Sequence, residues 1–398
     1  MKKEYLLTPG PSQVPSEVLL TLARPVFHHR TKRFQAIYAE TLGRLKQLFC
    51  AEQSDVVVFA SSGTGAMEAS VVNVVPPGKK ALCVQAGKFG ERWGEICKAF
   101  GIEYTELSLE WGKATPPALI AEHLAKDPTI AAVYVTLCET STGVENDIQA
   151  LAEVVRKTPA LLVVDGISGG GAIELRFDEW GVDLLAVGSQ KALMLPPGLA
   201  LLVVSPKAKA AIKAHPRRMS YYFDLVAALE KIADNDTPYT PALTLITALN
   251  EALKLIEAEG GVEAVWARHR LLAEATRAAV QALGLTVFSE RPSAALTTVV
   301  FPAGVDAGAV KKNLEAKGVS VADGQGKLKG KVIRIAHMGY CNQFDVLIAI
   351  GALEMVLAEM GAKVQLGAGL AAAEAVFVQA ARAAAAKAKT DVMPAQKK

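Results

Sequence analysis

The chain has 398 residues, of which 51% are hydrophobic and 21% are charged, and its formal net charge is +3 at pH 7. These values indicate an ordinary globular protein with an ample core, and the lack of a basic cluster interleaved with aromatic residues argues against nucleic-acid binding. No apolar run reaches the ~18 residues that a membrane-spanning helix needs, and the first residues lack the apolar core of a signal peptide.

The cysteines bear on the cellular compartment. Their number, five, is odd and none forms a C-x-x-C pair, which favours reduced thiols over disulfides or a zinc site. We therefore expect a cytoplasmic protein with no metal site and no membrane partner. The cysteines are Cys50, Cys83, Cys97, Cys138 and Cys341.

Short apolar runs alternate with helical stretches between about residue 55 and residue 205. Most of these runs are apolar throughout, which predicts strands buried on both faces of a mostly parallel sheet with helices on each side. Such sheets bind ligands beyond the carboxyl ends of their strands. The runs are Val56–Ala60, Ala81–Gln85, Ala131–Thr136, Leu161–Asp165, Leu184–Val187 and Ala200–Val204.

The rest of the chain predicts a smaller α/β region and a tail. A helical pattern covers Leu243–Ala258 and meets a glycine pair as its stop signal. Two further strand-like runs, Thr297–Phe301 and Val332–Ala336, precede a helical pattern over Asp345–Met360. The alanine-rich stretch Ala368–Lys389 also favours a helix, because alanine has the highest helix propensity.

Two charged residues at strand ends suggest a chemistry. Asp165 ends one apolar run, and Lys191 follows the next one in the turn after Gly188. A strand-end acid and a loop lysine one strand later are what a pyridoxal phosphate enzyme needs. The lysine forms a Schiff base with the cofactor, and the acid keeps the pyridine nitrogen protonated. Taken singly, each has an ordinary alternative, as a turn-forming aspartate or a solvated lysine.

Three other segments could serve the same site. Ser61–Ala69 opens a helix after a strand, so its free N–H groups could cradle a phosphate, although a plain capped helix is the alternative. Arg334 lies in an apolar run and suits a carboxylate, with a structural ion pair as the alternative. Phe89 follows a strand end and could stack on a flat ring. The cluster at His28 lacks a third ligand, which makes a metal site there a poor interpretation.

Together these segments resemble the class V aminotransferases of fold type I, and more narrowly the alanine–glyoxylate, serine–glyoxylate and serine–pyruvate aminotransferases. The resemblance runs from Leu6 to about Gly361, and its most specific piece is Gly188–Leu193 followed by Pro196–Gly198. Supporting pieces are Ser62–Ala69, Glu139–Gly143 and Arg334–Gly339.

The resemblance implies the fold and its division. A large domain would hold a mostly parallel seven-stranded sheet covered by helices, and a smaller C-terminal α/β domain would follow it. The implied parts are an N-terminal segment, 1–20, near the active site, the large domain, 21–255, the small domain, 256–362, and an alanine-rich helical tail, 363–398.

The resemblance also implies pyridoxal 5'-phosphate as cofactor and a role for each matching residue. Lys191 would carry the cofactor, and Asp165 would pair with its pyridinium nitrogen. Gly63, Thr64 and Gln190 would hold the phosphate of the cofactor. Phe89 would stack on its ring, Thr140 would lie near the hydroxyl edge of the ring, and Ser62 and Ile167 would complete the cofactor site. On the substrate side, Arg334 would clamp the α-carboxylate, and Pro9 and Gly10 would adjoin the substrate.

A further segment implies a shared site in a homodimer. Thr237, Tyr239 and Thr240 match a stretch that family members lend to the phosphate of the neighbouring subunit, and which of the three makes the contact stays open. The chain departs from many members in two places. It has Phe89 where a tryptophan is common. Its loop reads Asp165-Gly166-Ile167-Ser168, where many members read Asp-Ala-Val-Ser or Asp-Ser-Val.

The implied reaction is ping-pong transfer of an amino group from alanine, serine or aspartate to glyoxylate or pyruvate. Three alternatives on the same fold are a cysteine desulfurase-like lyase, an aminophosphonate transaminase and a noncatalytic partner subunit. The lyase is disfavoured because residues 318–334 contain no cysteine. A nicotinamide-binding protein is disfavoured because Glu68 stands where the third glycine of its motif belongs.

Overall fold

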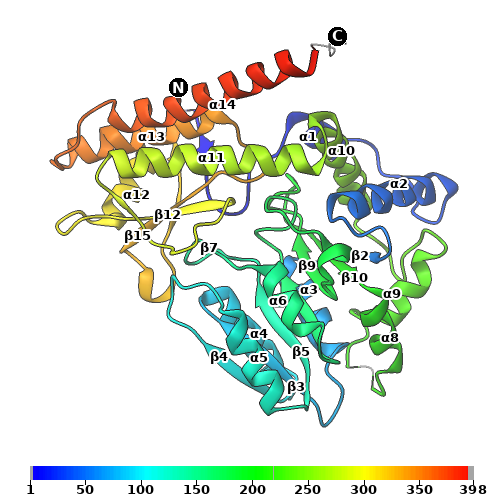
Figure 1. The fold of residues 1–398 in the computed structure, drawn as a ribbon. Coiled ribbons are helices and arrows are strands. Elements are labelled where there is room, and N and C mark those ends of the chain that lie inside the picture. The colour runs from blue at the N-terminus through cyan, green and yellow to red at the C-terminus, as the bar shows by residue number, and fades with distance from the viewer. Residues whose placement is uncertain (1–2, 218, 393–398) are drawn as a thin grey trace, which may run out of the picture.

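A seven-stranded sheet forms the centre of the larger part of the computed structural model, which describes residues 3–217 and 219–392 (Figure 1). Only β10 runs antiparallel to its neighbours, and all other neighbouring strands are parallel. The order across the sheet is β2 (Asp55–Ala60), β10 (Leu199–Val204), β9 (Leu184–Gly188), β8 (Leu161–Asp165), β5 (Ile130–Thr136), β3 (Lys80–Gln85) and β4 (Tyr104–Ser108). The prediction of a mostly parallel sheet is confirmed.

Six of these strands lie where apolar runs predict them, and β4 is the one that the apolar runs do not reveal. Its sequence mixes polar and apolar residues, and Leu107 is its only buried member. β4 lies at the edge of the sheet, so one of its sides needs no apolar cover.

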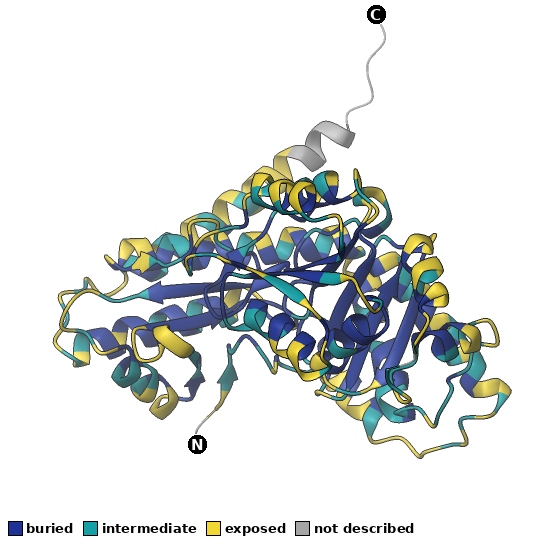
Figure 2. Cartoon of the chain, turned by 90° about the horizontal axis from the view of Figure 1, so that it is seen from below, coloured by how far each residue is buried: buried dark blue, intermediate teal, exposed yellow. Residues whose placement is uncertain are grey.

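Helices cover both faces of this sheet because successive strand residues point to opposite faces. In β5, Val133 and Val135 belong to one apolar cluster, and Ala132 and Tyr134 belong to the other. Figure 2 shows these strands as the most completely buried elements. One cluster includes α2 (Lys32–Leu48), α5 (Pro117–Lys126), α6 (Ile148–Val155), α7 (Phe177–Trp180) and α10 (Leu243–Glu259), and the other includes α3 (Gly63–Val72), α4 (Lys88–Ala99), α8 (Pro206–Ala214) and α9 (Leu225–Ile232).

A four-stranded antiparallel sheet forms the smaller part. Its order is β11 (Thr286–Val287), β12 (Leu296–Val300), β15 (Val332–Ala336) and β14 (Ala322–Asp323). The long helix α11 (Val262–Ala282) packs against α14 (Ala368–Val392) along this part (Figure 1). The remaining helices here are α12 (Ala307–Ala316), α13 (Gln343–Glu359) and the 3-10 turn η1 (Gly326–Leu328).

The predicted C-terminal helices are confirmed within the described residues. α10 ends at Gly260, whose φ of 116° is a left-handed conformation that favours glycine. α13 and α14 follow the predicted ranges closely, and residues 393–398 of the predicted helical tail lie outside the described part of the chain. The domain boundaries at 20, 255 and 362 stay predictions.

The N-terminal segment joins the two sheets. Its strand β1 (Tyr5–Leu6) pairs in parallel with β13 (Val319–Ser320), and the Leu7 carbonyl accepts a 2.8 Å hydrogen bond from Ala336 N at the end of β15. After α1 (Ser16–Leu22) the chain enters α2, and before it Ser12 N donates to Gln190 O over 3.0 Å. A short hairpin, β6 (Cys138–Glu139) and β7 (Val144–Glu145), follows β5.

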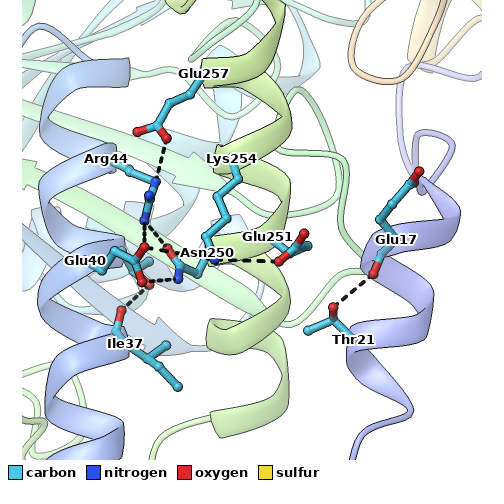
Figure 3. A network of polar contacts seen from close by, with 10 residues as sticks. Glu17, Thr21, Ile37, Glu40, Arg44, Asn250, Glu251, Lys254 and Glu257 are labelled. Atoms are coloured by element: carbon cyan, nitrogen blue, oxygen red, sulfur yellow. Dashed lines mark hydrogen bonds and ion pairs between the residues drawn. The ribbon is translucent and has the colours of Figure 1, made fainter.

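A polar network ties α2 to α10 (Figure 3). Arg44 forms ion pairs with Glu40 at 2.5 Å and Glu257 at 2.9 Å, and it donates to Asn250 Oδ1 over 2.9 Å. Asn250 in turn donates to Glu40 Oε2 over 2.8 Å.

Among the described helices, none is long and apolar enough to cross a membrane.

Candidate active site

The carboxyl ends of β8 and β9 bring Asp165 and Lys191 to one edge of the sheet, because these strands are parallel neighbours. The two residues line a cavity of about 230 Å³. Most of the residues predicted for the site meet there. They are Gly10, Ser62, Gly63, Thr64, Phe89, Thr140, Asp165, Ile167, Gln190 and Lys191.

Lys191 is held by the N-terminal segment. Its Nζ donates to the Pro9 carbonyl and, over 3.2 Å, to Ser168 Oγ. Gly10 has a φ of +126°, and a Cβ at that position would collide with the Lys191 side chain, so the close approach requires glycine. Burial lowers the pKa of Lys191 to about 8, and a larger share of its amine is therefore neutral and nucleophilic near pH 7.

Asp165 shows the opposite shift. Burial raises its pKa to about 7, although a 2.8 Å hydrogen bond from Ile167 N and the positive charges of Arg92 and Lys191 oppose the rise. A buried carboxyl of this kind is stabilised as a carboxylate by a further cationic partner. The protonated nitrogen of pyridoxal phosphate would be such a partner.

The N-terminus of α3 fits a phosphate. Ser62 occupies the N-cap position, yet its side chain makes no capping hydrogen bond. A Cβ at Gly63 would lie 2.7 Å from Ile167 Cδ1, so a larger residue would have to displace the Ile167 side chain. The buried Oε1 position of Gln190 has no partner within the described residues, and a flipped amide would present a donor there. Orphan donors at a helix start suit an anion, so these residues fit the cofactor's phosphate.

Arg334 lies beside the cavity and does not line it. Its Nε donates to Asp323 O over 2.8 Å, and its NH1 donates to Thr140 O over 3.0 Å. Within residues 3–217 and 219–392 it forms no ion pair, so the alternative of a structural ion pair finds no partner. Burial lowers its pKa to about 10, and unused N–H groups remain for an incoming carboxylate.

Thr237, Tyr239 and Thr240 lie away from the cavity of their own chain. Thr237 O accepts a 2.8 Å hydrogen bond from Arg30 NH1, and Tyr239 donates to Tyr221 O over 2.7 Å. Thr240 is exposed. These three residues therefore have no contact with the Lys191 cavity within the single chain.

Three residues of the site escape the sequence analysis. Ser168 shares a 2.6 Å hydrogen bond with Thr140 Oγ1, and it stands three residues after Asp165, a proximity that could have revealed it. Arg92 lines the cavity one helical turn after Phe89. Glu139 accepts hydrogen bonds from Phe89 N at 3.2 Å and from Gly90 N at 2.8 Å, and burial raises its pKa. Glu139 opens a segment that supports the family resemblance, but its contacts with α4 could not be predicted from that segment.

Comparisons with known proteins identify the family of this chain. The family described as Aminotransferase class-V matches residues 4–342. The chain is 38% identical to the L-aspartate–glyoxylate aminotransferase of Paracoccus denitrificans, over 96% of this chain and 98% of that one. It is 40% identical to a Synechococcus protein named soluble hydrogenase, small subunit, over 94% of this chain and 98% of that one.

A solved structure shows the same architecture. The ureidoglycine–glyoxylate aminotransferase of Bacillus subtilis superposes with a TM-score of 0.88 and 31% identity, over 95% of this chain and 98% of that one. The chain belongs to the class V aminotransferases, and it is a pyridoxal phosphate-dependent transaminase of fold type I.

Proposed function

We propose that this transaminase moves an amino group from a small L-amino acid, namely alanine, serine or aspartate, to glyoxylate or pyruvate. The observation that carries the proposal is the placement of Lys191, with its lowered pKa, opposite the buried Asp165 in one small cavity. Glyoxylate appears in the names of both the Paracoccus relative and the Bacillus structure, which supports it as acceptor.

The residues of the chain suit the parts of such a reaction. Bound pyridoxal phosphate supplies an electron sink for the amino acid's α-carbon. Lys191 Nζ would accept the α-proton and later return it, which requires a pKa near the working pH. Asp165 would hold the proton on the ring nitrogen, and the free N–H groups of Arg334 would orient the α-carboxylate.

The chemistry of amino-group transfer supports a ping-pong sequence. An amino group retained in the site between two half-reactions lets the first oxo acid leave before the second one binds. We expect parallel lines in double-reciprocal plots of rate against donor at several acceptor concentrations. Intersecting lines would contradict the ping-pong order.

We also propose a cytoplasmic homodimer with shared active sites. Thr237, Tyr239 and Thr240 do not line their own cavity, and Tyr239 packs against the rings of Tyr221 and Tyr222, which supports a role in a neighbouring subunit's site. Tyr221 is 84% exposed, and Tyr222 stacks on Tyr239 with ring centroids 5.5 Å apart. All five cysteines are free thiols, which agrees with a reducing compartment.

The test is an absorbance titration of the purified protein with L-alanine, L-serine and L-aspartate, one at a time. The preferred donor should convert the lysine-bound cofactor band to the amino form, and glyoxylate or pyruvate should restore it. Lys191→Ala should abolish both the band and turnover, whereas Lys157→Ala, at an exposed loop lysine, should change neither. Bound cofactor that no donor converts would overturn the proposal and favour a noncatalytic partner subunit.

A further inference from the structure

Arg92 is a further cation in the cavity, and the reaction proposed above does not use it. It lies in α4, one turn after Phe89, and it lines the same cavity as Lys191 and Asp165. The side chain is neither fully buried nor fully exposed. A guanidinium in such a position can serve a ligand and still be shielded from bulk water.

Its contacts join the two parts of the cofactor site. Arg92 NH1 donates to Thr64 Oγ1 over 3.3 Å, at the start of α3. The guanidinium carbon lies 5.1 Å from the centroid of the Phe89 ring, within cation–π range. One side chain thus contacts both the helix start that fits a phosphate and the ring that would stack on the cofactor.

Arg92 has no direct ion-pair partner in the described part of the chain, although its charge opposes the rise in the pKa of Asp165. Other arginines between helices are paired, as Arg44 is with Glu40 and Arg268 is with Glu259. Arg92 forms no ion pair within residues 3–217 and 219–392, and its hydrogen bond to Thr64 goes to a neutral hydroxyl. Four of the five guanidinium N–H donors remain for a ligand, because that hydrogen bond uses one.

The surroundings favour a phosphate as this ligand. The uncapped start of α3 lies in this region, and a helix N-terminus attracts negative charge. Gln190 lines the same cavity, and its amide would present a donor there in the flipped orientation. The α-carboxylate of a donor has its own clamp in Arg334, on the side of Thr140. A guanidinium next to Thr64 is therefore nearer to the place of a phosphate than to that of the α-carboxylate.

We propose that Arg92 binds the phosphate of the cofactor as its charged partner and, through the same guanidinium, holds the Phe89 ring in stacking position. This inference rests on the cofactor site assigned under the proposed function. Arg92 is a binding and positioning residue, and it takes no part in proton transfer. The remaining competitor for its charge is the side-chain carboxylate of a donor such as aspartate.

The experiment compares two ligands that differ only in the phosphate. Cofactor-free protein is titrated with pyridoxal phosphate and with pyridoxal, and binding is followed by absorbance. Arg92→Gln should weaken pyridoxal phosphate binding by about tenfold to hundredfold, the usual range for a lost hydrogen bond to a charged group. Its binding of pyridoxal should change by less than about threefold, and Arg92→Lys should recover part of the loss.

Lys88→Gln provides the matched control. Lys88 lies one helical turn before Arg92, carries the same charge and is paired with Glu91 at 2.9 Å, so its removal should leave both affinities unchanged. Thermal unfolding of each cofactor-free variant separates a binding defect from a folding defect. If Arg92→Gln is unfolded, the Arg92→Lys variant is used in its place. Its affinity for pyridoxal phosphate relative to its affinity for pyridoxal is then compared with the same ratio in the wild-type protein.

Three outcomes would overturn the inference. Equal losses for pyridoxal phosphate and pyridoxal would leave Arg92 with a purely structural role at Phe89. Unchanged affinities with a higher KM for aspartate alone would assign Arg92 to the substrate's side-chain carboxylate. Unchanged affinities and unchanged KM would leave no role for its charge. A wild-type protein that binds no pyridoxal phosphate would instead contradict the proposed function itself.

Discussion

At the scale of single residues, burial alone sets the two reactive groups apart. Lys191 and Asp165 are both almost fully buried, and burial disfavours the charged form of each. The pKa of the amine therefore falls to about 8, and the pKa of the carboxyl rises to about 7. The two groups titrate close to each other, which suits the proton-transfer role proposed for Lys191 near neutral pH.

The burial of Lys191 predicts that its positive charge lowers the free energy of unfolding of the cofactor-free protein, by an amount that depends on pH. Because the folded pKa of about 8 lies below the ordinary 10.5, the cost is fully present below pH 8 and disappears as the pH rises toward 10.5. Lys191→Met should thus stabilise the protein at pH 7, by up to about 3 kcal/mol. The measurement is urea unfolding of both proteins between pH 7 and pH 10. A difference in stability that does not shrink with rising pH would contradict the lowered pKa of Lys191.

At the scale of elements, the helix pair α2 and α10 depends on a polar network as well as on apolar packing. Arg44 stands at its centre, since three side chains from the two helices bind it (Figure 3). The Arg44 side chain is 18% exposed, whereas that of Lys254 is 44% exposed and lies 3.8 Å from Glu251. Exposed pairs contribute little, while networks with short contacts contribute more.

The network predicts a difference between two charge removals on neighbouring helices. Arg44→Ala should lower the free energy of unfolding by about 1–3 kcal/mol, because Asn250 and Glu40 lose a shared donor. Lys254→Ala should lower it by less than about 0.5 kcal/mol. Chemical denaturation of the two variants checks this order. Equal losses in the free energy of unfolding would mean that the short contacts of Arg44 add no stability beyond that of apolar packing.

At the scale of the whole molecule, one chain does not bring all the predicted site residues together. Ten of them line the cavity, whereas Thr237, Tyr239 and Thr240 lie elsewhere. The proposed homodimer would supply these three from the neighbouring subunit. A symmetric pair of chains would then hold two equivalent sites, each built from both chains.

Mixing inactive variants tests this sharing. One variant carries Lys191→Ala, and the other carries Thr237→Ala, Tyr239→Phe and Thr240→Ala. Each should be inactive or nearly so alone. Random reassociation would give half mixed dimers with one intact site each, so the mixture should regain about a quarter of wild-type activity. If the mixture stays inactive while sedimentation shows mixed dimers, the three residues do not serve a neighbouring site.

Much of the fold and the centre of the site could be predicted from the sequence. Runs of apolar residues mark buried strands, and Asp165 and Lys191 each stand directly after such a run. The motif of small residues at Ser62–Ala69 similarly marks the start of α3. These signals are local, so they need no knowledge of which strands are neighbours.

Other features depend on contacts between distant parts of the chain. The edge strand β4 has no run of apolar residues, because only one of its residues is buried. Glu139 meets α4, Arg92 meets Thr64, and Pro9 meets Lys191 only after the strands have taken their order in the sheet. The sequence by itself thus predicted six of the seven strands of the large sheet, the resemblance to the family and the pair of Asp165 and Lys191. Only the tertiary structure decided which polar groups surround that pair, because those contacts join residues that no local pattern relates.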